Sequence, residues 1–232
     1  MTAFIQDKKQ IGKNSLCSWS GGKDSCFALM QAIQFGYTPK VLLNVLNEEG
    51  KISRSHGIPH SILQQQAATA KIPLYAIASS WKEYELHFTA ALKDLKEQYQ
   101  LTHAVFGDID LQPHRDWEEK VCTNAALTAV LPLWKQDRRQ LVNQMLESGI
   151  ETMIVSCNEK MGERFIGKII TTSLIDELES MEIDACGENG EFHTLVLDCP
   201  LFKNRIDVRI EKALYHEGYW FSELKPGLVV SA

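Results

Sequence analysis

The chain has 232 residues, with 24 Lys and Arg against 30 Asp and Glu, which gives a formal net charge of −6. Its hydrophobic fraction of 44% and charged fraction of 23% are ordinary for a globular protein, so a disordered, collagen-like or disulfide-scaffold chain is excluded. The acidic balance disfavours a nucleic-acid partner, because phosphate binding depends on clustered Lys and Arg.

No segment approaches the roughly 18 consecutive apolar residues of a membrane span, and the first residues lack the apolar core of a signal peptide. The six cysteines form no C-x-x-C pair and stand mostly among apolar residues, as reduced, buried thiols do. We therefore expect a cytoplasmic protein with no membrane partner.

In chain order, residues 1–13 are polar and without periodicity, which predicts a flexible leader. A short strand at 15–19 runs into a glycine-containing loop, and the apolar residues that follow fall on one face of a helix that Gly36 ends. Apolar runs then predict strands at 40–46, 74–78 and 104–106, and helical spacing predicts helices at 61–71, 84–99 and 113–127.

The remaining sequence predicts helices near 141–146 and 173–181, strands at 152–157 and 192–197, and β-rich runs at 206–210 and 215–221. Strands that read as apolar runs and alternate with helices predict an α/β fold with a doubly wound, mostly parallel sheet. The alternation loosens after Cys157, so we expect a first domain over 14–135 and a smaller C-terminal α+β region over 136–232.

The loop between the first strand and helix, Ser20-Gly21-Gly22-Lys23-Asp24-Ser25, is suited to a phosphate or pyrophosphate. Its glycines let successive N–H groups point into one concavity, and the helix N-terminus adds a favourable dipole. Ser20 and Ser25 supply hydroxyl donors, Lys23 supplies a positive charge, and Asp24 can cap the helix or help to hold magnesium. The spacing fits neither a Walker A loop nor G-x-G-x-x-G, and an ordinary strand-to-helix turn is the alternative.

Two later segments carry further candidate residues. Phe106-Gly107-Asp108 ends a strand, which is where open α/β sheets place their ligands, and the acidic stretch 115–119 follows it. Residues 187–196, with the sequence GENGEFHTLV, place two glycines and two carboxylates before an apolar strand. Each segment taken alone is also compatible with a solvated turn.

Together these segments carry a resemblance to a known family. The SGGKDS loop resembles the SGGxDS loop of the PP-loop ATP pyrophosphatases, a superfamily with a Rossmann-like fold. With Gly107-Asp108-Ile109, Pro132-Leu133-Trp134 and the GE-x-GE segment, the match spans roughly residues 15 to 202 and resembles the diphthine–ammonia ligase family. It implies that 14–135 is a PP-loop nucleotide-binding domain and that 136–232 binds the other substrate.

The resemblance implies an ATP-dependent amide ligase that adenylates a carboxylate, transfers it to ammonia and releases AMP and pyrophosphate, with ATP and magnesium as cofactors. The nucleotide would contact the loop and three strand-end residues, namely Ser20, Gly21, Gly22, Lys23, Asp24 and Ser25 with Leu46, Phe106 and Gly107. The expected catalytic residues are Lys23, Asp24, Asp108, Glu188 and Glu191, of which Asp24 and Asp108 would hold magnesium. The expected substrate-binding residues are Arg115, Trp117, Glu119, Trp134 and Thr194.

In the reaction that names the family, the carboxylate belongs to diphthine on elongation factor 2, which also carries a trimethylammonium group. Acidic residues beside Trp117 or Trp134 would suit such a cation through charge and cation–π attraction. This chain departs from the family pattern at Asn189, where glycine is common, and at His193, where an acidic residue is common. The GENGEFHT form resembles a bacterial-like branch, and bacteria do not make diphthamide, so a different small acid stays open as the substrate.

Other interpretations stay open at this point. A PP-loop enzyme that thiolates RNA would use cysteines such as Cys122 and Cys157, although buried structural thiols are the favoured interpretation of both. A nucleotide-binding protein without turnover is a further alternative, and a homodimer is compatible with the sequence. We expect His56 and His60 in a loop over the nucleotide rather than as a helical metal pair, because Gly57 and Pro59 interrupt a helix there.

Overall fold

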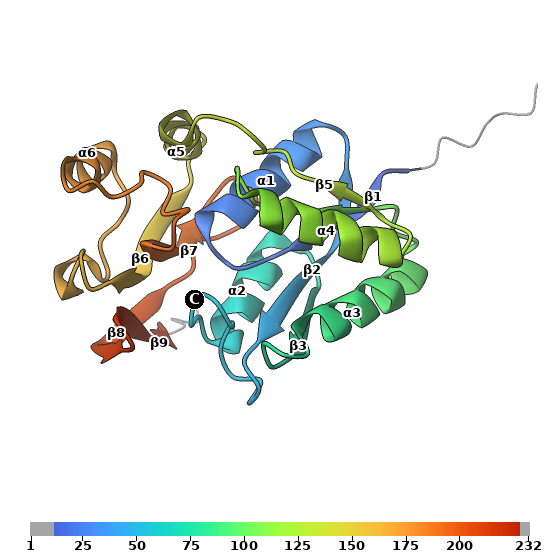
Figure 1. Cartoon of the computed structure of the whole chain (residues 1–232), viewed down its shortest axis with the longest axis horizontal. Helices are drawn as coiled ribbons and strands as arrows, with labels where there is room; N and C mark the ends of the chain where they lie inside the picture. Colours follow the sequence, from blue (N-terminus) through green and yellow to red (C-terminus); the bar gives the residue numbers. More distant parts are fainter. Residues whose placement is uncertain (1–11, 228–232) are drawn as a thin grey trace, which may run out of the picture.

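The structure is a computed structural model that describes residues 12–227, so the predicted leader lies almost wholly outside the described part (Figure 1). Its first half is built on a parallel five-stranded sheet with the strand order β3-β2-β1-β4-β5. The strands are β1 (Asn14–Ser18), β2 (Thr38–Leu46), β3 (Leu74–Ala78), β4 (His103–Val105) and β5 (Thr128–Val130). This order, with β1 in the centre, confirms the predicted doubly wound sheet.

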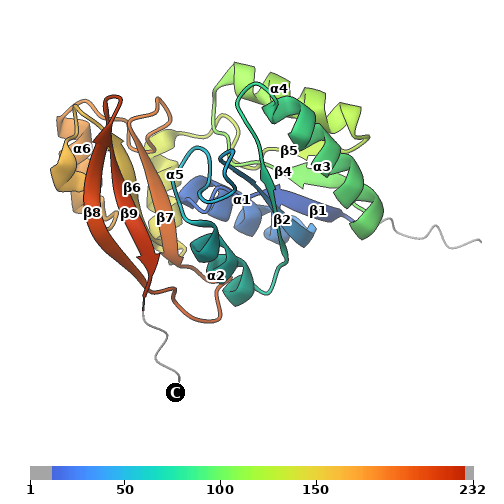
Figure 2. The same ribbon diagram turned by 90° about the horizontal axis from the view of Figure 1, so that it is seen from below.

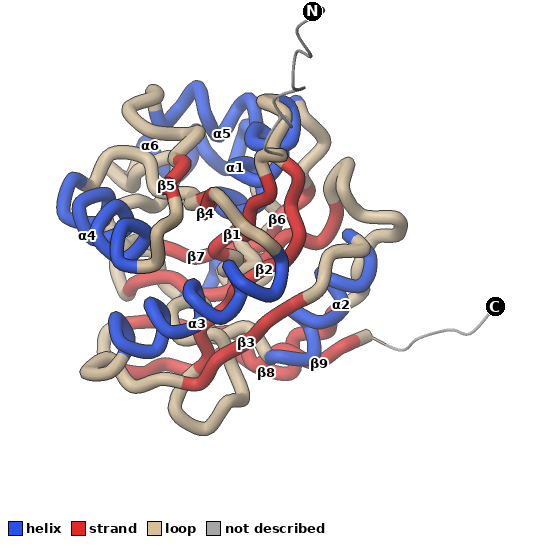
Figure 3. Tube along the Cα trace, turned by 90° about the vertical axis from the view of Figure 1, so that its right-hand side faces the viewer, coloured by secondary structure: helices blue, strands red, loops and turns tan. Residues whose placement is uncertain are grey.

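Helices cover both faces of this sheet because its strands are apolar on both sides (Figure 2). Alternate residues of β1 show the division, since Leu16 packs in the cluster with Phe88 while Cys17 packs in the cluster with Leu29. Two helices, α3 and α4, lie side by side on one face, where the Phe88 and Trp117 ring centroids are 5.2 Å apart (Figure 3). The four helices are α1 (Lys23–Gln34), α2 (His60–Ala70), α3 (Tyr84–Tyr99) and α4 (Gln112–Asn124).

The second half forms a separate antiparallel sheet with the strand order β7-β6-β9-β8, which stands beside the first sheet (Figure 2). Its strands are β6 (Glu151–Asn158), β7 (Phe192–Asp198), β8 (Val208–His216) and β9 (Tyr219–Pro226). The helical segments are α5 (Arg138–Glu147), the short 3-10 helix η1 (Glu163–Phe165) and α6 (Thr172–Ser180). This arrangement confirms the smaller α+β region. One apolar cluster runs from α1 and α2 into the second sheet, and the boundary at residue 135 stays a prediction.

Two local expectations were wrong or incomplete. The edge strand β5 was not predicted, because it has only three residues, one exposed and two half-buried, which make too weak an apolar signal. The predicted run at 215–221 crosses a tight hairpin turn at Glu217 and Gly218, both of which have positive φ. Tyr215 pairs with Trp220 across that turn, so aromatic residues on both sides of it read as one strand. Within the described residues, no helix is long and apolar enough to cross a membrane.

Candidate active site

The glycine loop connects the carboxyl end of β1 to the first turn of α1, as predicted. Gly21 has a φ of +87°, and a Cβ there would lie 2.8 Å from Leu63 and 3.0 Å from Ile58, so the position requires glycine. The Ser20 hydroxyl accepts a hydrogen bond from the Gly22 N–H at 3.2 Å and lies 3.0 Å from the Ser25 hydroxyl. The loop thus folds back on itself at the helix N-terminus, where backbone N–H groups and the helix dipole favour an anion.

Lys23 joins this loop to the GE-x-GE segment. Its side chain is 3% exposed, and its ammonium donates to both carboxylate oxygens of Asp24, at 2.8 and 3.0 Å, and to the Cys186 carbonyl at 2.5 Å. Its backbone N–H donates to the Thr194 hydroxyl at 3.1 Å. Burial by itself would lower the pKa of Lys23. Asp24 and other nearby acidic groups raise this pKa by more than burial lowers it, so it lies above the ordinary value. The carboxylate of Asp24 pairs with Lys23 and does not cap the helix. The N-cap residue of α1 is Gly22, which has no side chain to cap it.

A cavity of about 690 Å³ opens beside Lys23. It lies where the carboxyl ends of β1 and β4 meet the segment that precedes β7. Ten of the predicted residues line it: Ser20, Lys23, Asp24, Ser25, Phe106, Gly107, Asp108, Trp117, Glu188 and Thr194. Gly107 permits this convergence, because a Cβ there would lie 2.7 Å from the Ser25 backbone nitrogen.

Other predicted residues do not line the cavity. Leu46 is 3% exposed and packs in the apolar core under the sheet edge. Arg115 pairs with Glu119 one helical turn away at 2.7 Å, and its guanidinium lies 5.1 Å from the centre of the Trp134 ring. These three side chains form a cluster outside the cavity, because helix α4 turns Trp117 and Glu118 toward the cavity instead.

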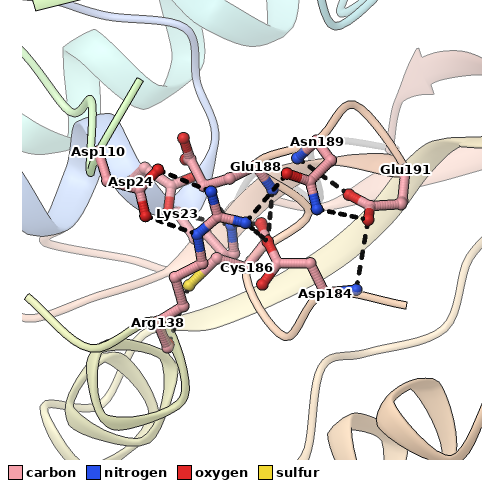
Figure 4. Close-up of polar contacts among 9 residues, drawn as sticks. All are labelled: Lys23, Asp24, Asp110, Arg138, Asp184, Cys186, Glu188, Asn189 and Glu191. Carbon is pink, nitrogen blue, oxygen red and sulfur yellow. Dashed lines mark hydrogen bonds and ion pairs between the residues drawn. The ribbon is translucent and has the colours of Figure 1, made fainter. Parts of the chain in front are cut away.

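Glu191 stabilises the loop that presents Glu188 (Figure 4). Its carboxylate accepts hydrogen bonds from the Asn189 N–H at 3.1 Å, the Asn189 side-chain amide at 3.0 Å and the Asp184 N–H at 3.4 Å. Glu191 is 9% exposed and does not line the cavity, whereas Glu188 does. The structure therefore gives Glu191 a supporting position. Burial, and after it the nearby Asp24, raises the pKa of Glu188 to about 8.

Arg138 connects the same loop to the first domain and was not predicted (Figure 4). Its guanidinium donates to both carboxylate oxygens of Asp110, at 2.6 and 2.9 Å, and pairs with Asp184 at 3.1 Å. Asp184 in turn accepts the Glu188 N–H at 2.7 Å. Nothing local marks these residues, because the partners stand 28 and 46 positions from Arg138 in the chain.

A second unpredicted group surrounds Asp108. His114 lies 2.7 Å from an Asp108 carboxylate oxygen, and Glu118 lies buried next to them in the cavity wall. Burial, followed by the hydrogen bond and charge of Asp108, raises the pKa of Glu118 to about 11. Burial also acts to raise the pKa of Asp108, but hydrogen bonds from His114 and Glu118 lower it below its usual value. The i, i+4 spacing of His114 and Glu118 places both on one face of α4, and that was the available signal.

Two histidines line the other side of the cavity. The rings of His56 and His193 are 4.5 Å apart, and His56 reaches to 2.8 Å from where a Cβ on Gly22 would be. Burial, and after it the charge of Lys23, lowers the pKa of His193 to about 4, and burial, then His193 and Lys23, lowers that of His56 well below its usual value. Both rings are therefore neutral beside the anion-binding loop. His56 lies in a loop as predicted, but His60 begins helix α2, so the loop holds only one of the two histidines, and its contact with a nucleotide stays a prediction.

The described residues contain no cluster of three side chains placed to hold a metal ion. Both oxygens of Asp24 bond Lys23, and one oxygen of Asp108 bonds His114. Magnesium usually binds one or two carboxylates together with substrate phosphates and waters. The roles of Asp24 and Asp108 toward magnesium therefore stay predictions.

Both halves of the chain match models of known protein families. The family model for the diphthamide synthase N-terminal domain matches residues 13–129, and the model for the diphthamide synthase C-terminal domain matches residues 137–229. The diphthine–ammonia ligase of Schizosaccharomyces pombe is 30% identical over 219 residues, which cover 85% of this chain but 36% of that protein. Those of Mus musculus and Homo sapiens are each 27% identical over 229 residues, covering 88% of this chain and 85% of theirs.

Among solved structures, a predicted subunit of tRNA methyltransferase from Methanocaldococcus jannaschii shares 15% identity, with a TM-score of 0.45 over 81% of this chain and 98% of that one. This likeness is too distant to carry an argument. The two family models together cover most of the chain, and the motifs in its sequence point the same way. The chain belongs to the diphthamide synthase family, whose relatives named above are ligases that join diphthine to ammonia.

Proposed function

We propose that this protein is an ATP-dependent ligase that adenylates a carboxylate and transfers the acyl group to ammonia, with release of AMP and pyrophosphate. The observation that carries this proposal is the junction at Lys23. Lys23 belongs to the anion-binding loop, where it pairs with Asp24, and its ammonium also contacts the carbonyl of Cys186, the residue directly before the GE-x-GE segment. Lys23 neutralises Asp24 here, so this carboxylate does not repel phosphates at the loop, and the acid substrate can bind in the same cavity.

ATP would place its phosphates against the loop N–H groups and the N-terminus of α1. His56, His193 and Thr194 line the same side of the cavity and are uncharged at neutral pH, so they can approach phosphate oxygens without repulsion. We propose that magnesium enters as the counter-ion of the ATP phosphates, with Asp24 and Asp108 as the candidate carboxylates beside it. Its chemistry there would be to neutralise phosphate charge.

The acid substrate that the family suggests first is diphthine on elongation factor 2. Trp81 and Tyr84 line the cavity with their rings stacked 5.6 Å apart, and Glu188 stands in the same cavity, so a cationic group would find aromatic faces and negative charge. The departures at Asn189 and His193 keep a second candidate, a different small carboxylic acid. The adenylation chemistry is the same for both.

The cysteines favour this function over RNA thiolation. Burial raises the pKa of Cys122 to about 12 and that of Cys157 to about 11, and neither residue lines the cavity. Cys186 does line it, but burial raises its pKa to about 12 as well. A thiolating enzyme needs a reactive thiolate, which these environments disfavour.

The test is to incubate the full chain with magnesium ATP, ammonium and either diphthine-bearing elongation factor 2 or a panel of small acids. We expect acid-dependent formation of AMP, pyrophosphate and amide. ADP in place of AMP would refute the mechanism, and ATP binding without AMP release would favour the non-catalytic alternative.

Lys23→Met should lower turnover about 100-fold or more. Lys93→Met, on the exposed side of α3, is the matched control. A cytoplasmic location and a homodimer stay predictions.

A further inference from the structure

The side chain of Gln66 joins three separate parts of the candidate active site. Gln66 lies on α2, is 0% exposed, and donates hydrogen bonds to the Gly21 carbonyl at 3.0 Å and to the Val196 carbonyl at 2.8 Å. Its side-chain oxygen accepts the Trp19 indole N–H at 2.9 Å. Because two carbonyl oxygens face its nitrogen and a donor faces its oxygen, these partners allow only one orientation of the amide. A buried amide whose donors are both paired rigidifies the segments that it joins.

The carbonyl oxygen of Gly21 is held from two sides. It accepts the Gln66 amide and, at 2.9 Å, the backbone N–H of Val196. Val196 lies on β7, an edge strand whose other side pairs with β6. Both lone pairs of the Gly21 oxygen are therefore used. The loop is thereby fastened to the edge of the second sheet, and Gln66 completes this connection because it also bonds the Val196 carbonyl.

The held carbonyl sets the direction of the next N–H group in the loop. In a trans peptide the C=O and the N–H point to opposite sides, so a Gly21 carbonyl fixed toward Gln66 turns the Gly22 N–H away from Gln66. That N–H donates to the Ser20 hydroxyl at 3.2 Å, and Ser20 lines the cavity. Glycines stand on both sides of this peptide, so little steric resistance opposes its rotation by half a turn. A rotated peptide would present a carbonyl oxygen where an anion requires a donor.

We propose that Gln66 is a positioning residue for the nucleotide: it locks the Gly21–Gly22 peptide so that the loop presents an N–H group, and not a carbonyl oxygen, to the pyrophosphate part of ATP. This inference rests on the proposed function, in which the loop binds the phosphates, and it explains how two consecutive glycines keep one geometry. Gln66 does not line the cavity, so it acts through the loop and touches no substrate. The glycine motif does not reveal this role, since Gln66 stands 45 positions after Gly21 in the chain.

The test compares phosphate binding with nucleoside binding in the full chain. Gln66→Met keeps the length of the side chain and removes its three hydrogen bonds. Calorimetry with magnesium pyrophosphate should give a dissociation constant about tenfold higher than that of the wild type, or more, because a donor to the anion is lost and a carbonyl oxygen takes its place. Adenosine carries no phosphate, so its dissociation constant, followed by NMR titration, should change less than about threefold.

Thr152→Val is the matched control for a loss of stability alone. Thr152 is 2% exposed, and its hydroxyl donates to the Leu195 carbonyl of β7 at 3.0 Å. The change therefore removes a buried side-chain hydrogen bond to the same strand but leaves every contact of the loop in place. It should lower the melting temperature, as Gln66→Met does, while the dissociation constant for pyrophosphate stays within about twofold of the wild type.

Three results with folded variants overturn the lock. The first is an unchanged affinity of Gln66→Met for pyrophosphate, which would leave Gln66 a purely structural role. The second is an equal loss for pyrophosphate and adenosine, because the whole site would then have moved. The third is an equal loss of pyrophosphate affinity in Thr152→Val, because stability alone would then explain the effect.

If Gln66→Met does not fold, NMR of the wild type decides. Pyrophosphate should shift the Gly22 amide resonance, and the side-chain amide protons of Gln66 should stay protected from exchange with solvent. An unshifted Gly22 amide, or a Gln66 amide that exchanges freely, overturns the lock. A wild type that binds no pyrophosphate overturns both the lock and the proposed function. Pyrophosphate binding without acid-dependent AMP formation refutes the proposed function alone.

Discussion

Replacing Arg138 with methionine tests whether the network behind the GE-x-GE loop sets the geometry of the site. The change removes two hydrogen bonds to Asp110 and the ion pair with Asp184, which are 28% and 11% exposed. Charge-assisted hydrogen bonds contribute about 1.5–3 kcal/mol each when buried, and partial exposure reduces this, so we expect a loss of about 2–3 kcal/mol in the free energy of unfolding. Asp184 also holds the Glu188 N–H, so the loop should lose its position.

The neighbouring Arg139 provides a matched control. It also pairs with two carboxylates, Asp176 and Glu179, but these are 63% and 43% exposed. Exposed ion pairs contribute about 0–1 kcal/mol, so Arg139→Met should cost less than about 1 kcal/mol. Urea unfolding of both variants measures the difference, and pyrophosphate exchange should show a raised KM for the acid only in Arg138→Met. Equal costs for the two variants, or an unchanged KM in Arg138→Met, would refute the reasoning.

Three further predictions concern single side chains. Gly107→Ala places a Cβ 2.7 Å from the Ser25 backbone nitrogen, so it should cost about 1–3 kcal/mol in urea unfolding and weaken ATP binding in calorimetry. The pKa of His193 falls from 6.5 to about 4 on folding, so the unfolded state binds its proton first. The contribution of His193 to stability should fall as pH drops from about 6.5 to 4, and His193→Asn should remove up to ~1.4 kcal/mol per pH unit from the slope in urea titrations. The pKa of Glu118 rises from 4.5 to about 11, so its unfolded form ionises first, and the contribution of Glu118 to stability should fall as pH rises above about 4.5. Glu118→Gln should therefore gain on the wild type between pH 5 and pH 9 by thermal melting, and a constant difference would contradict the shift.

What the sequence predicted correctly depends on signals that lie close together in the chain. The glycine loop is local: strand, two glycines, lysine and helix follow one another within about twenty residues, and their geometry leaves few alternatives. The parallel sheet follows from apolar runs that alternate with helices. The carboxyl-end position of Gly107 and Asp108 follows from that sheet, since ligands bind where parallel strands end.

What the sequence could not predict depends on the rotation of a helix or on distant partners. Helix α4 is polar on more than one side, so its spacing does not show whether Glu118 or Glu119 faces the cavity. The packing of Trp117 against Phe88 on α3 sets that rotation, and it turns Glu118 inward. The different positions of Glu188 and Glu191 are decided in the same way, by hydrogen bonds to Asp184 and Asn189 that have no signature in the sequence.

The charges in the cavity explain how a polyphosphate can bind there. Four carboxyl groups line it beside Lys23, namely Asp24, Asp108, Glu118 and Glu188, and four negative charges would repel ATP. Lys23 neutralises Asp24, burial keeps Glu118 protonated, and a pKa of about 8 keeps much of Glu188 protonated at neutral pH. Asp108 is then the main carboxylate in the cavity that remains charged. Burial of the acidic groups, together with Lys23, therefore allows a polyphosphate to bind in a cavity lined by carboxyl groups.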